Sequence, residues 1–314
     1  MINYYMKVLI SGGAGQISYS LLPMIANGSV FGTNKSIELI LFDIPPALNA
    51  LHGVKMELED SCYTLLKDVI ITDDPKVAFN DIDVAILLGG FPRREGMDRN
   101  DLINKNTSIF KSNGENLNLY AKSSCKVLVV ANPANTNCLV TMKNCPKLNK
   151  KNFTCLTMLD HNRATAFLSN KFSKPLNNVI IWGNHSKTQY PDHNNVGINL
   201  TEEEKHEFIR TIQYRGDKII KLRKLSSAMS AAKAIADHLR IWLIDGTPDG
   251  QFVSMGIYSE GHYGVEKDII FSFPCVCTNG EYQIVENLNL DEDVLKGIKL
   301  SQEELLLEKK LTEL

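Results

Sequence analysis

Near the start of the chain stands Lys7-Val8-Leu9-Ile10-Ser11-Gly12-Gly13-Ala14-Gly15-Gln16-Ile17-Ser18, the stretch that decides the fold. Its apolar first part predicts a buried strand, and a helix-like run over 16–26 follows directly after the glycines. Glycines permit a tight turn and close backbone approach, so a pyrophosphate could rest on the free N–H groups at the positive end of the helix. The alternative is an ordinary tight turn. The missing Gly-Lys-Ser/Thr sequence argues against a mononucleotide kinase.

The first part of the chain repeats this pattern of an apolar run followed by an amphipathic segment. The runs show little alternation between apolar and polar residues, which is typical of strands buried on both faces. Between residues 101 and 120, apolar residues recur at helical spacing. The pattern predicts an α/β fold with a parallel, doubly wound sheet, whose ligand crevice lies beyond the carboxyl ends of the strands. The apolar runs are Lys7–Ser11, Ile37–Phe42, Asp83–Leu88, Lys126–Val130 and Val179–Trp182.

Composition narrows the class of protein. A chain of 314 residues, 44% of them hydrophobic, is long enough for two domains. Its 34 Lys and Arg against 36 Asp and Glu leave a net charge of −2, which offers no broad basic surface for nucleic acid or an anionic membrane. The seven cysteines form no Cys-x-x-Cys pair, which argues for reduced thiols and against a zinc site.

The ends of the chain and its hydrophobic runs suggest a location. No run is long and apolar enough to span a bilayer, and almost nothing precedes the first strand that could act as a targeting signal. We therefore expect a cytoplasmic protein that binds a small molecule and no metal.

The second predicted strand ends at Asp43. A carboxylate at this point can accept hydrogen bonds from both hydroxyls of an adenosine ribose, and its charge would repel a 2′-phosphate. Asp43 lies further downstream than the roughly 20 residues that are usual, which a long intervening helix and loop could explain. Together with the glycine turn, Asp43 predicts NAD as the cofactor.

Polar residues also follow the next two predicted strands. Arg93 and Arg99 lie in a loop with Gly and Pro, and Asn132 precedes Pro133. Guanidinium groups suit carboxylates, and the amide of Asn132 can donate to a substrate oxygen. The simpler interpretations are a solvated basic loop and a plain turn.

The segment 156–164 holds the strongest candidates for chemistry. In a helix, Asp160 and Arg163 would project from one face, and His185 follows the run that ends at Trp182. The carboxylate can hold the imidazole in one tautomer and stabilise its protonated form, while the guanidinium can bind a substrate carboxylate. The alternative is a structural ion pair and a structural histidine. Three arginines in one crevice would favour a dicarboxylate whose carbonyl is also polarised.

After residue 185 the pattern changes. Thr201 and Glu204 form a predicted capping box, and a further helix is expected over 227–239. Ser301 and Glu304 are predicted to cap a C-terminal helix.

The later strands are expected to be antiparallel, with Asn279-Gly280 as a hairpin turn between the last two. We therefore expect an NAD-binding domain at residues 1–155 and an α+β substrate-binding and catalytic domain at residues 156–314. The expected strands are 251–259, 269–277 and 282–286.

Six segments together resemble the lactate/malate dehydrogenase family, and within it the cytosolic type of malate dehydrogenase. The likeness runs from about residue 7 to the C-terminus, and the segments around Asp160 and His185 are highly specific. The resemblance implies a Rossmann-type fold and reversible hydride transfer between malate and NAD+, giving oxaloacetate and NADH. The segments are Gly12–Ser18, Pro92–Arg99, Asn132–Asn137, Leu156–Ala164, Ile181–His185 and Lys224–Lys233.

The resemblance also implies catalytic roles. His185 would take the hydroxyl proton of malate, and Asp160 would orient it. Arg163 would hold the C1 carboxylate, Arg93 would hold the distal carboxylate, and Arg99 would polarise the reacting carbonyl.

Further implications concern the cofactor and the assembly. Asn132 would contact substrate and nicotinamide, and the bond between Asn132 and Pro133 would be cis. Loop closure would exclude water from the pocket. Family members are typically homodimers, so a homodimer is expected. The positions that match cofactor contacts are Gly12, Gly15, Gln16, Ile17, Asp43, Asn106, Val130 and Asn132.

The chain departs from the family pattern in a few places. The segment 191–201 is short, Asn113 stands where a glutamine is usual, and Met158 replaces an arginine of the animal enzymes. Pro23 falls inside the first expected helix, so that helix either bends or has another boundary. None of these changes removes a catalytic group.

Two alternatives stay open at this point. The first is a lactate dehydrogenase derived from a malate enzyme. Arg93 opposes it, because a guanidinium facing the methyl group of pyruvate would lack a partner. The second is a non-catalytic paralogue that binds NADH without turnover. The set Asp160, Arg163 and His185 counts against it, although a fold alone never assures activity.

Overall fold

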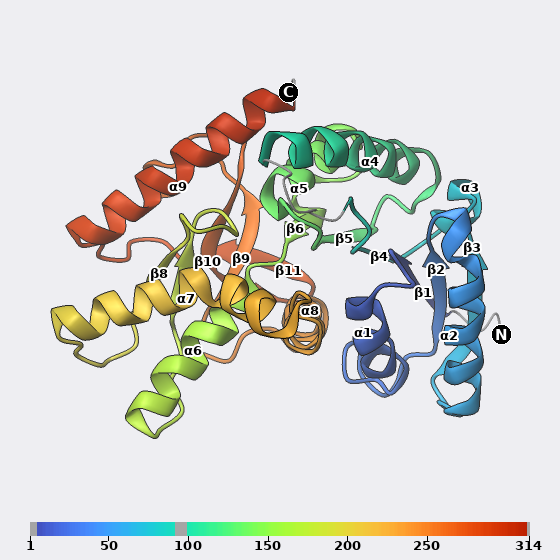
Figure 1. Ribbon diagram of the computed structural model, residues 1–314, viewed down its shortest axis with the longest axis horizontal. Coiled ribbons are helices and arrows are strands. Elements are labelled where there is room, and N and C mark those ends of the chain that lie inside the picture. The colour runs from blue at the N-terminus through green and yellow to red at the C-terminus, as the bar shows by residue number, and fades with distance from the viewer. Residues whose placement is uncertain (1–4, 92–98, 313–314) are drawn as a thin grey trace.

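The computed structural model describes residues 5–91 and 99–312. Across these residues it shows a nine-stranded sheet with helices on both faces and a two-stranded sheet beside it (Figure 1). The α/β class with a doubly wound parallel sheet is therefore confirmed, and so are the antiparallel strands of the second half.

Six parallel strands form one side of the large sheet, in the order β3-β2-β1-β4-β5-β6. The chain first winds outward from β1 and then returns to β4 on the other side of β1, which creates a crevice at their carboxyl ends. The sequence did not predict β3, and the run taken as the third strand is β4. The bounds are β1 Met6–Ser11, β2 Ile37–Phe42, β3 Leu66–Thr72, β4 Val84–Leu87, β5 Lys126–Val129 and β6 Phe153–Cys155.

Helices of the first half cover both faces of these strands. On β1, Val8 and Ile10 pack into one core with α1 and α2, while Leu9 on the opposite face packs into a second core with α4 and α5. This alternation follows from the two-residue period of a strand. The bounds are α1 Gln16–Ala26, the short η1 Pro45–Ala47, α2 Leu48–Asp60, α3 Pro75–Ala78, α4 Arg99–Tyr120, α5 Ala134–Lys143 and the short η2 Lys150–Asn152.

Three antiparallel strands extend the same sheet beyond β6. The junction is a single pair, Cys155 with Gly256, and a Cβ at position 256 would lie 2.1 Å from the sulfur of Cys155. Only glycine fits there. The run predicted at 179–182 is not part of this sheet, because it forms a separate antiparallel pair. The bounds are β7 Ile180–Trp182, β8 Tyr190–Asp192, β9 Val253–Tyr258, β10 Ile270–Thr278 and β11 Glu281–Ile284.

Most predicted helices of the second half are confirmed. Thr201 and Glu204 form the capping box of α7. In the first half, the expected helix α1 keeps its boundaries and continues through Pro23. One prediction is wrong: Asp291, not Ser301, caps the last helix, and Ser301 lies buried inside it. The bounds are α6 Met158–Phe172, α7 Glu202–Arg223, α8 Met229–Arg240, η3 Ile241–Asp245, η4 His262–Gly264 and α9 Glu292–Leu311.

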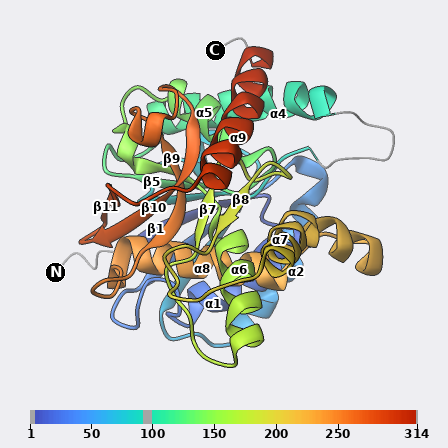
Figure 2. The ribbon, with the colours of Figure 1, turned by 90° about the vertical axis from the view of Figure 1, so that its left-hand side faces the viewer.

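The C-terminal helix α9 packs against elements from both halves of the chain. It contacts α4 and α5 of the first half as well as β7 and β8 of the second (Figure 2). Helix α8 contacts α1 in the same way from the other side of the sheet. The two halves are thus joined by packed helices as well as by the shared sheet.

Candidate active site

The glycine turn lies at the carboxyl ends of β1 and β4. Gly12 has a φ of +69°, and a Cβ on it would lie 2.7 Å from the backbone of Gly89. Gly15 and Gln16 at the start of α1 are exposed, and the first turn has no side-chain cap within the described residues. The turn therefore leaves the helix N-terminus open to an anionic group.

Asp43 lies directly after β2 and is turned toward the glycine turn. One carboxylate oxygen accepts from the backbone N–H of Ala14 at 3.0 Å, and the other accepts from Ile44 at 2.8 Å. Asp43 thus fixes the turn, and each oxygen still has a lone pair for a further donor such as a ribose hydroxyl.

Asn106 supports the site from within α4, although its side chain is buried. Its amide oxygen accepts from the backbone N–H of Phe91 at 2.8 Å, and its NH₂ group donates to the carbonyls of Leu102 and Asn132 at 3.1 and 3.2 Å. The side chain therefore holds two loops together, and its polar atoms are occupied by the backbone.

The segment after β5 lies between these loops. Val130 is partly buried, and its N–H donates to the carbonyl of Leu87 at 3.0 Å. Asn132 is exposed, so its amide is accessible, and the Asn132–Pro133 peptide bond is cis, as expected from the resemblance.

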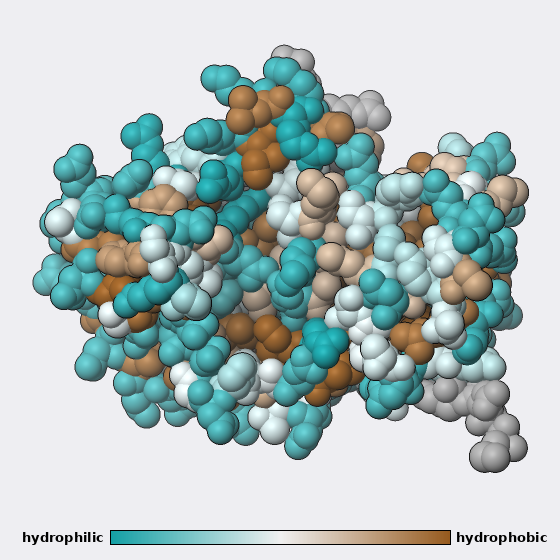
Figure 3. Space-filling model, turned by 90° about the horizontal axis from the view of Figure 1, so that it is seen from below, coloured by the Kyte–Doolittle hydropathy of each residue, from teal (hydrophilic) through white to brown (hydrophobic). Residues whose placement is uncertain are grey.

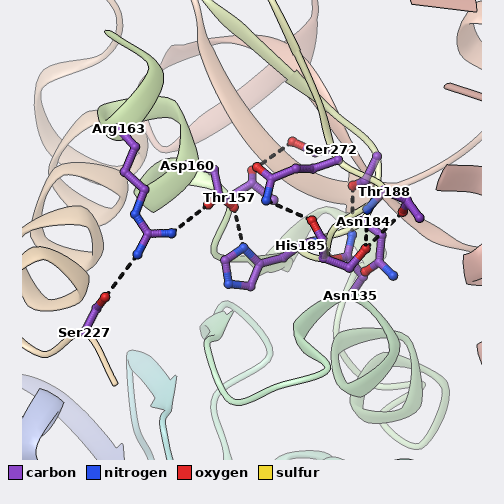
Figure 4. A network of polar contacts seen from close by, with 12 residues as sticks. Asn135, Thr157, Asp160, Arg163, Asn184, His185, Thr188, Ser227 and Ser272 are labelled. Atoms are coloured by element: carbon purple, nitrogen blue, oxygen red, sulfur yellow. Dashed lines mark hydrogen bonds and ion pairs between the residues drawn. The ribbon is translucent and has the colours of Figure 1, made fainter. Parts of the chain in front are cut away.

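Asp160 stands at the centre of the polar cluster that follows β6. Its carboxylate is fully buried in the first turn of α6 and accepts a hydrogen bond from Nδ1 of His185. The other oxygen of Asp160 accepts from Arg163 at 3.1 Å. Figure 4 shows His185 and Arg163 on opposite sides of Asp160, coming from a loop and a helix. The structure therefore brings these three predicted residues together.

The electrostatics of Asp160 fit this arrangement. Burial acts to raise the pKa of Asp160, but the charges and hydrogen bonds of His185 and Arg163 outweigh it, so the pKa lies below its ordinary value. A carboxylate that stays ionised fixes the proton of the imidazole on Nδ1 and leaves Nε2 for a substrate. This is the geometry of a general acid/base and its orienting partner.

Several residues that the sequence did not single out complete the cluster. Ser227 accepts from Arg163 Nη2 at 3.0 Å, and Asn135 accepts from the backbone N–H of His185 at 2.9 Å. Ser227 and Asn135 lie within motifs of the family resemblance, so the motifs contained a signal, but short polar side chains are too common to stand out alone.

Two predicted substrate contacts, Arg93 and Arg99, follow β4 in the sequence. Arg93 lies outside the described residues, and Arg99 is the first residue of α4. Of the departures from the family pattern, Asn113 and Met158 are buried in α4 and α6. Both therefore lie away from bulk solvent.

The described residues also bear on other kinds of site. Among them, no group of His, Cys, Asp and Glu side chains could hold a metal ion, and no helix is long and apolar enough to cross a membrane. All seven cysteines are free thiols, and Cys62 is exposed whereas the others are buried.

Known proteins give an independent comparison. Residues 6–154 match the NAD binding domain of lactate/malate dehydrogenase, and residues 157–313 match the alpha/beta C-terminal domain of the same family. The cytoplasmic malate dehydrogenase of Homo sapiens is 53% identical over 321 aligned residues, which cover 96% of each chain. That of Medicago sativa is 49% identical and covers 97% of this chain and 96% of its own.

Solved structures agree with this comparison. Malate dehydrogenase from Naegleria fowleri is 41% identical, with a TM-score of 0.95 over 100% of this chain and 99% of that chain. Trichomonas vaginalis lactate dehydrogenase in complex with NADH and oxamate is 37% identical, with a TM-score of 0.93 over 98% of each chain. With both domains matched and half the residues identical to curated relatives, the chain belongs to the lactate/malate dehydrogenase family.

Proposed function

We propose that this protein is an NAD-dependent malate dehydrogenase that interconverts malate and oxaloacetate. The observation that carries the proposal is the contact of His185 with the buried carboxylate of Asp160, which also binds Arg163. An acid/base and a carboxylate-binding group thus share one wall of the site. The similarity of about half the residues to proteins named malate dehydrogenase supports the substrate.

In the proposed reaction, Nε2 of His185 takes the hydroxyl proton of malate. Asp160 stabilises the imidazolium that forms, because its carboxylate is ionised and hydrogen-bonded to Nδ1. Arg163 donates from Nη1 to Asp160 and from Nη2 to Ser227, and the second N–H of each of these nitrogens is proposed to bind the C1 carboxylate. In oxaloacetate reduction, the same imidazolium returns the proton to the carbonyl oxygen.

The described residues fit NAD. The glycine turn allows close approach to the open N-terminus of α1, and Asp43 stands where a ribose can bind. Asn132 is exposed next to this crevice. When bound, NAD accepts the hydride from C2 of malate. The residues proposed to hold it are Gly12, Gly15, Gln16, Ile17, Asp43, Val130 and Asn132, with Asn106 acting through the backbone of its neighbours.

Arg93 and Arg99 are proposed to complete the substrate site. Arg93 would bind the distal carboxylate, which pyruvate lacks, and Arg99 would polarise the reacting carbonyl. Both follow β4, whose carboxyl end lies beside that of β1 in the sheet. The sequence position of Arg93 is thus the feature that favours malate over lactate.

We also propose the division into an NAD-binding domain at 1–155 and a substrate domain at 156–314. A cytoplasmic location is proposed because relatives with about half of their residues identical are named cytoplasmic.

A homodimer is proposed, and exposed apolar side chains on three neighbouring helices support it. Helix α1 contacts α2 and α8, and these three helices carry the exposed apolar side chains of Tyr19, Met56 and Met229. Figure 3 shows, on the face seen from below, apolar groups among polar ones. Light scattering after gel filtration should give twice the mass of one chain, and a monomer mass would reject the dimer.

The activity is tested by following NADH absorbance with oxaloacetate and, separately, with pyruvate. We expect oxaloacetate to be reduced with a kcat/KM at least about 100-fold above that for pyruvate, because a carboxylate facing Arg93 replaces an unpaired charge. Preferred use of pyruvate would identify a lactate dehydrogenase. NADH binding without turnover of either acid would identify a non-catalytic paralogue.

A further inference from the structure

One face of the C-terminal helix α9 lies against the loop that carries His185. Ser301, Glu304 and Glu308 are spaced three and four residues apart, so their side chains project from the same side of the helix. All three contact the loop over residues 183–188, which connects β7 to β8. The helix thus meets the acid/base loop with polar side chains, two of which carry carboxylates.

We propose that Glu304 is a positioning residue for the hydride-transfer reaction: it holds the loop so that His185 meets Asp160 and the substrate. The inference rests on the malate dehydrogenase function proposed above. Glu304 does not touch the reacting atoms, and it acts through Asn184, Ser186 and Thr188.

Three contacts of Glu304 carry the inference. Its Oε2 atom accepts from the side-chain amide of Asn184 at 2.9 Å, from the hydroxyl of Thr188 at 2.6 Å, and from the hydroxyl of Ser186. These donors stand on both sides of His185 in the sequence. A single carboxylate oxygen therefore fixes the loop before and after the catalytic residue.

Glu308 joins this network to the first half of the chain. It is buried, with an exposed fraction of 3%, and accepts from Asn184 at 3.0 Å and from the hydroxyl of Thr136. The neighbour of Thr136 in α5, Asn135, accepts the backbone N–H of His185 at 2.9 Å. Helices α9 and α5 thus both hold the loop. Figure 4 shows Asn135 of α5 close to Asn184 and His185 of the loop.

Ser301 fixes the distance between helix and loop. Its hydroxyl accepts from the backbone N–H of Asn184 at 2.7 Å. Gly183 has a φ of +97°, and a Cβ on it would lie 2.0 Å from that hydroxyl oxygen. The helix therefore passes so close to the loop that only glycine fits, and a small change in α9 must move the backbone beside His185.

A purely structural role would be served more simply by apolar side chains. Glu308 is buried and Glu304 is partly buried, and withdrawing a carboxylate from water is costly unless hydrogen bonds compensate for it. On the same helix, Val294, Ile298 and Leu305 already supply apolar packing. Hydrogen bonds differ from apolar contacts in that they fix direction as well as proximity. We infer that the carboxylates serve the geometry of the loop.

The test compares Glu304→Ala with Glu303→Ala. Glu303 is an exposed neighbour on the same helix, so the control makes the same change in charge and length. We expect Glu304→Ala to lower kcat for oxaloacetate reduction by about 30-fold, because a misplaced acid/base slows the chemical step. The affinity for NADH, measured by fluorescence, should change by less than about twofold, since the cofactor residues are elsewhere.

An isotope effect separates positioning from a loss of folded protein. With NADH deuterated at the transferred position, the effect on kcat should rise in Glu304→Ala, because the chemical step limits turnover more fully. A smaller fraction of folded enzyme lowers kcat without changing the isotope effect. Glu304→Gln keeps an acceptor oxygen and should restore kcat to within about threefold of the unchanged protein.

Other results would overturn the inference. A kcat for Glu304→Ala within about twofold of Glu303→Ala, or a lower kcat with an unchanged isotope effect, would show that Glu304 does not position His185. If Glu304→Ala does not fold, Thr188→Val removes one of its donors and is judged by the same readouts. Failure of the proposed function would appear separately, as absence of oxaloacetate turnover in the unchanged protein.

Discussion

The backbone N–H of His185 donates to the side-chain oxygen of Asn135 at 2.9 Å, although the two residues are 50 positions apart. The amide of Asn135 donates in turn to the carbonyls of Gly183 and Ile270 at 3.2 and 3.0 Å. The first turn of α5 therefore holds the backbone of the loop that carries His185, while Asp160 accepts a hydrogen bond from the imidazole of His185. One residue, His185, is thus held by both halves of the chain, through its backbone by Asn135 and through its imidazole by Asp160.

Asp160→Asn tests the orienting carboxylate. The amide is close to the same size, but it lacks the charge that stabilises the imidazolium and can present NH₂ to Nδ1. We expect kcat for oxaloacetate reduction to fall by about 1,000-fold. Steady-state kinetics measures this, with the exposed Asp249→Asn as control. A loss below about tenfold would rule out the assigned role of Asp160.

Arg163→Lys tests the two-pronged donor. Lysine keeps the charge but cannot bind Asp160, Ser227 and a substrate carboxylate at once. We expect kcat/KM for oxaloacetate to fall by about 100-fold while NADH affinity is unchanged. The exposed Arg210→Lys on α7 is the matched control. Equal losses in the two variants would remove Arg163 from the substrate site.

Arg93→Leu tests the choice of substrate. Removing the guanidinium takes away the partner of the distal carboxylate and leaves an apolar group that tolerates the methyl of pyruvate. Oxaloacetate turnover should fall by orders of magnitude, and relative use of pyruvate should rise. Parallel assays of the two acids measure the ratio. An unchanged preference would refute the role given to Arg93.

Asp268 should make stability depend on acidity. Burial would raise its pKa, but the hydrogen bonds and charges of Lys143 and Lys309 lower the pKa to about 2. A carboxyl group whose pKa is lower in the folded than in the unfolded state stabilises the fold above its unfolded pKa. That contribution is lost as the pH falls from about 4 to about 2.

Asp268→Asn tests this dependence. Because about a third of the Asp268 side chain is exposed, solvent screening limits the expected loss to about 1 kcal/mol near pH 7. Asparagine also tolerates the positive φ of this position. Urea unfolding should show the difference between the two proteins shrinking toward about pH 3. A difference that stays constant with pH would contradict the prediction.

Local patterns were sufficient for many elements. The glycine turn, the strand before it and the capping box of Thr201 and Glu204 depend on neighbouring residues, and each was predicted from them. Strand β3 was missed, because Lys67 and Asp68 follow Leu66 and interrupt the apolar pattern of the run 66–72. It lies at the edge of the sheet, where polar side chains can reach water.

The error at Ser301 and Glu304 shows where local reasoning stops. A Ser followed three residues later by a Glu is a capping pattern, yet the helix begins at Glu292 and both side chains bind a distant loop instead. Thr201 with Glu204 shows the same spacing, but there the side chains bind the backbone of their own helix start. A partner more than a hundred positions away has no signature in the local sequence.

The sequence by itself determined the strand-turn-helix that opens the fold, the alternation of strands and helices, and the residue types of the site, because these follow from periodicity and side-chain chemistry. The tertiary structure decided which side chains meet: Asp160 between His185 and Arg163, Asn106 across two loops, and α9 against the loop of the acid/base. These contacts depend on long-range packing, and the stabilisation that each contact provides depends on the groups around it.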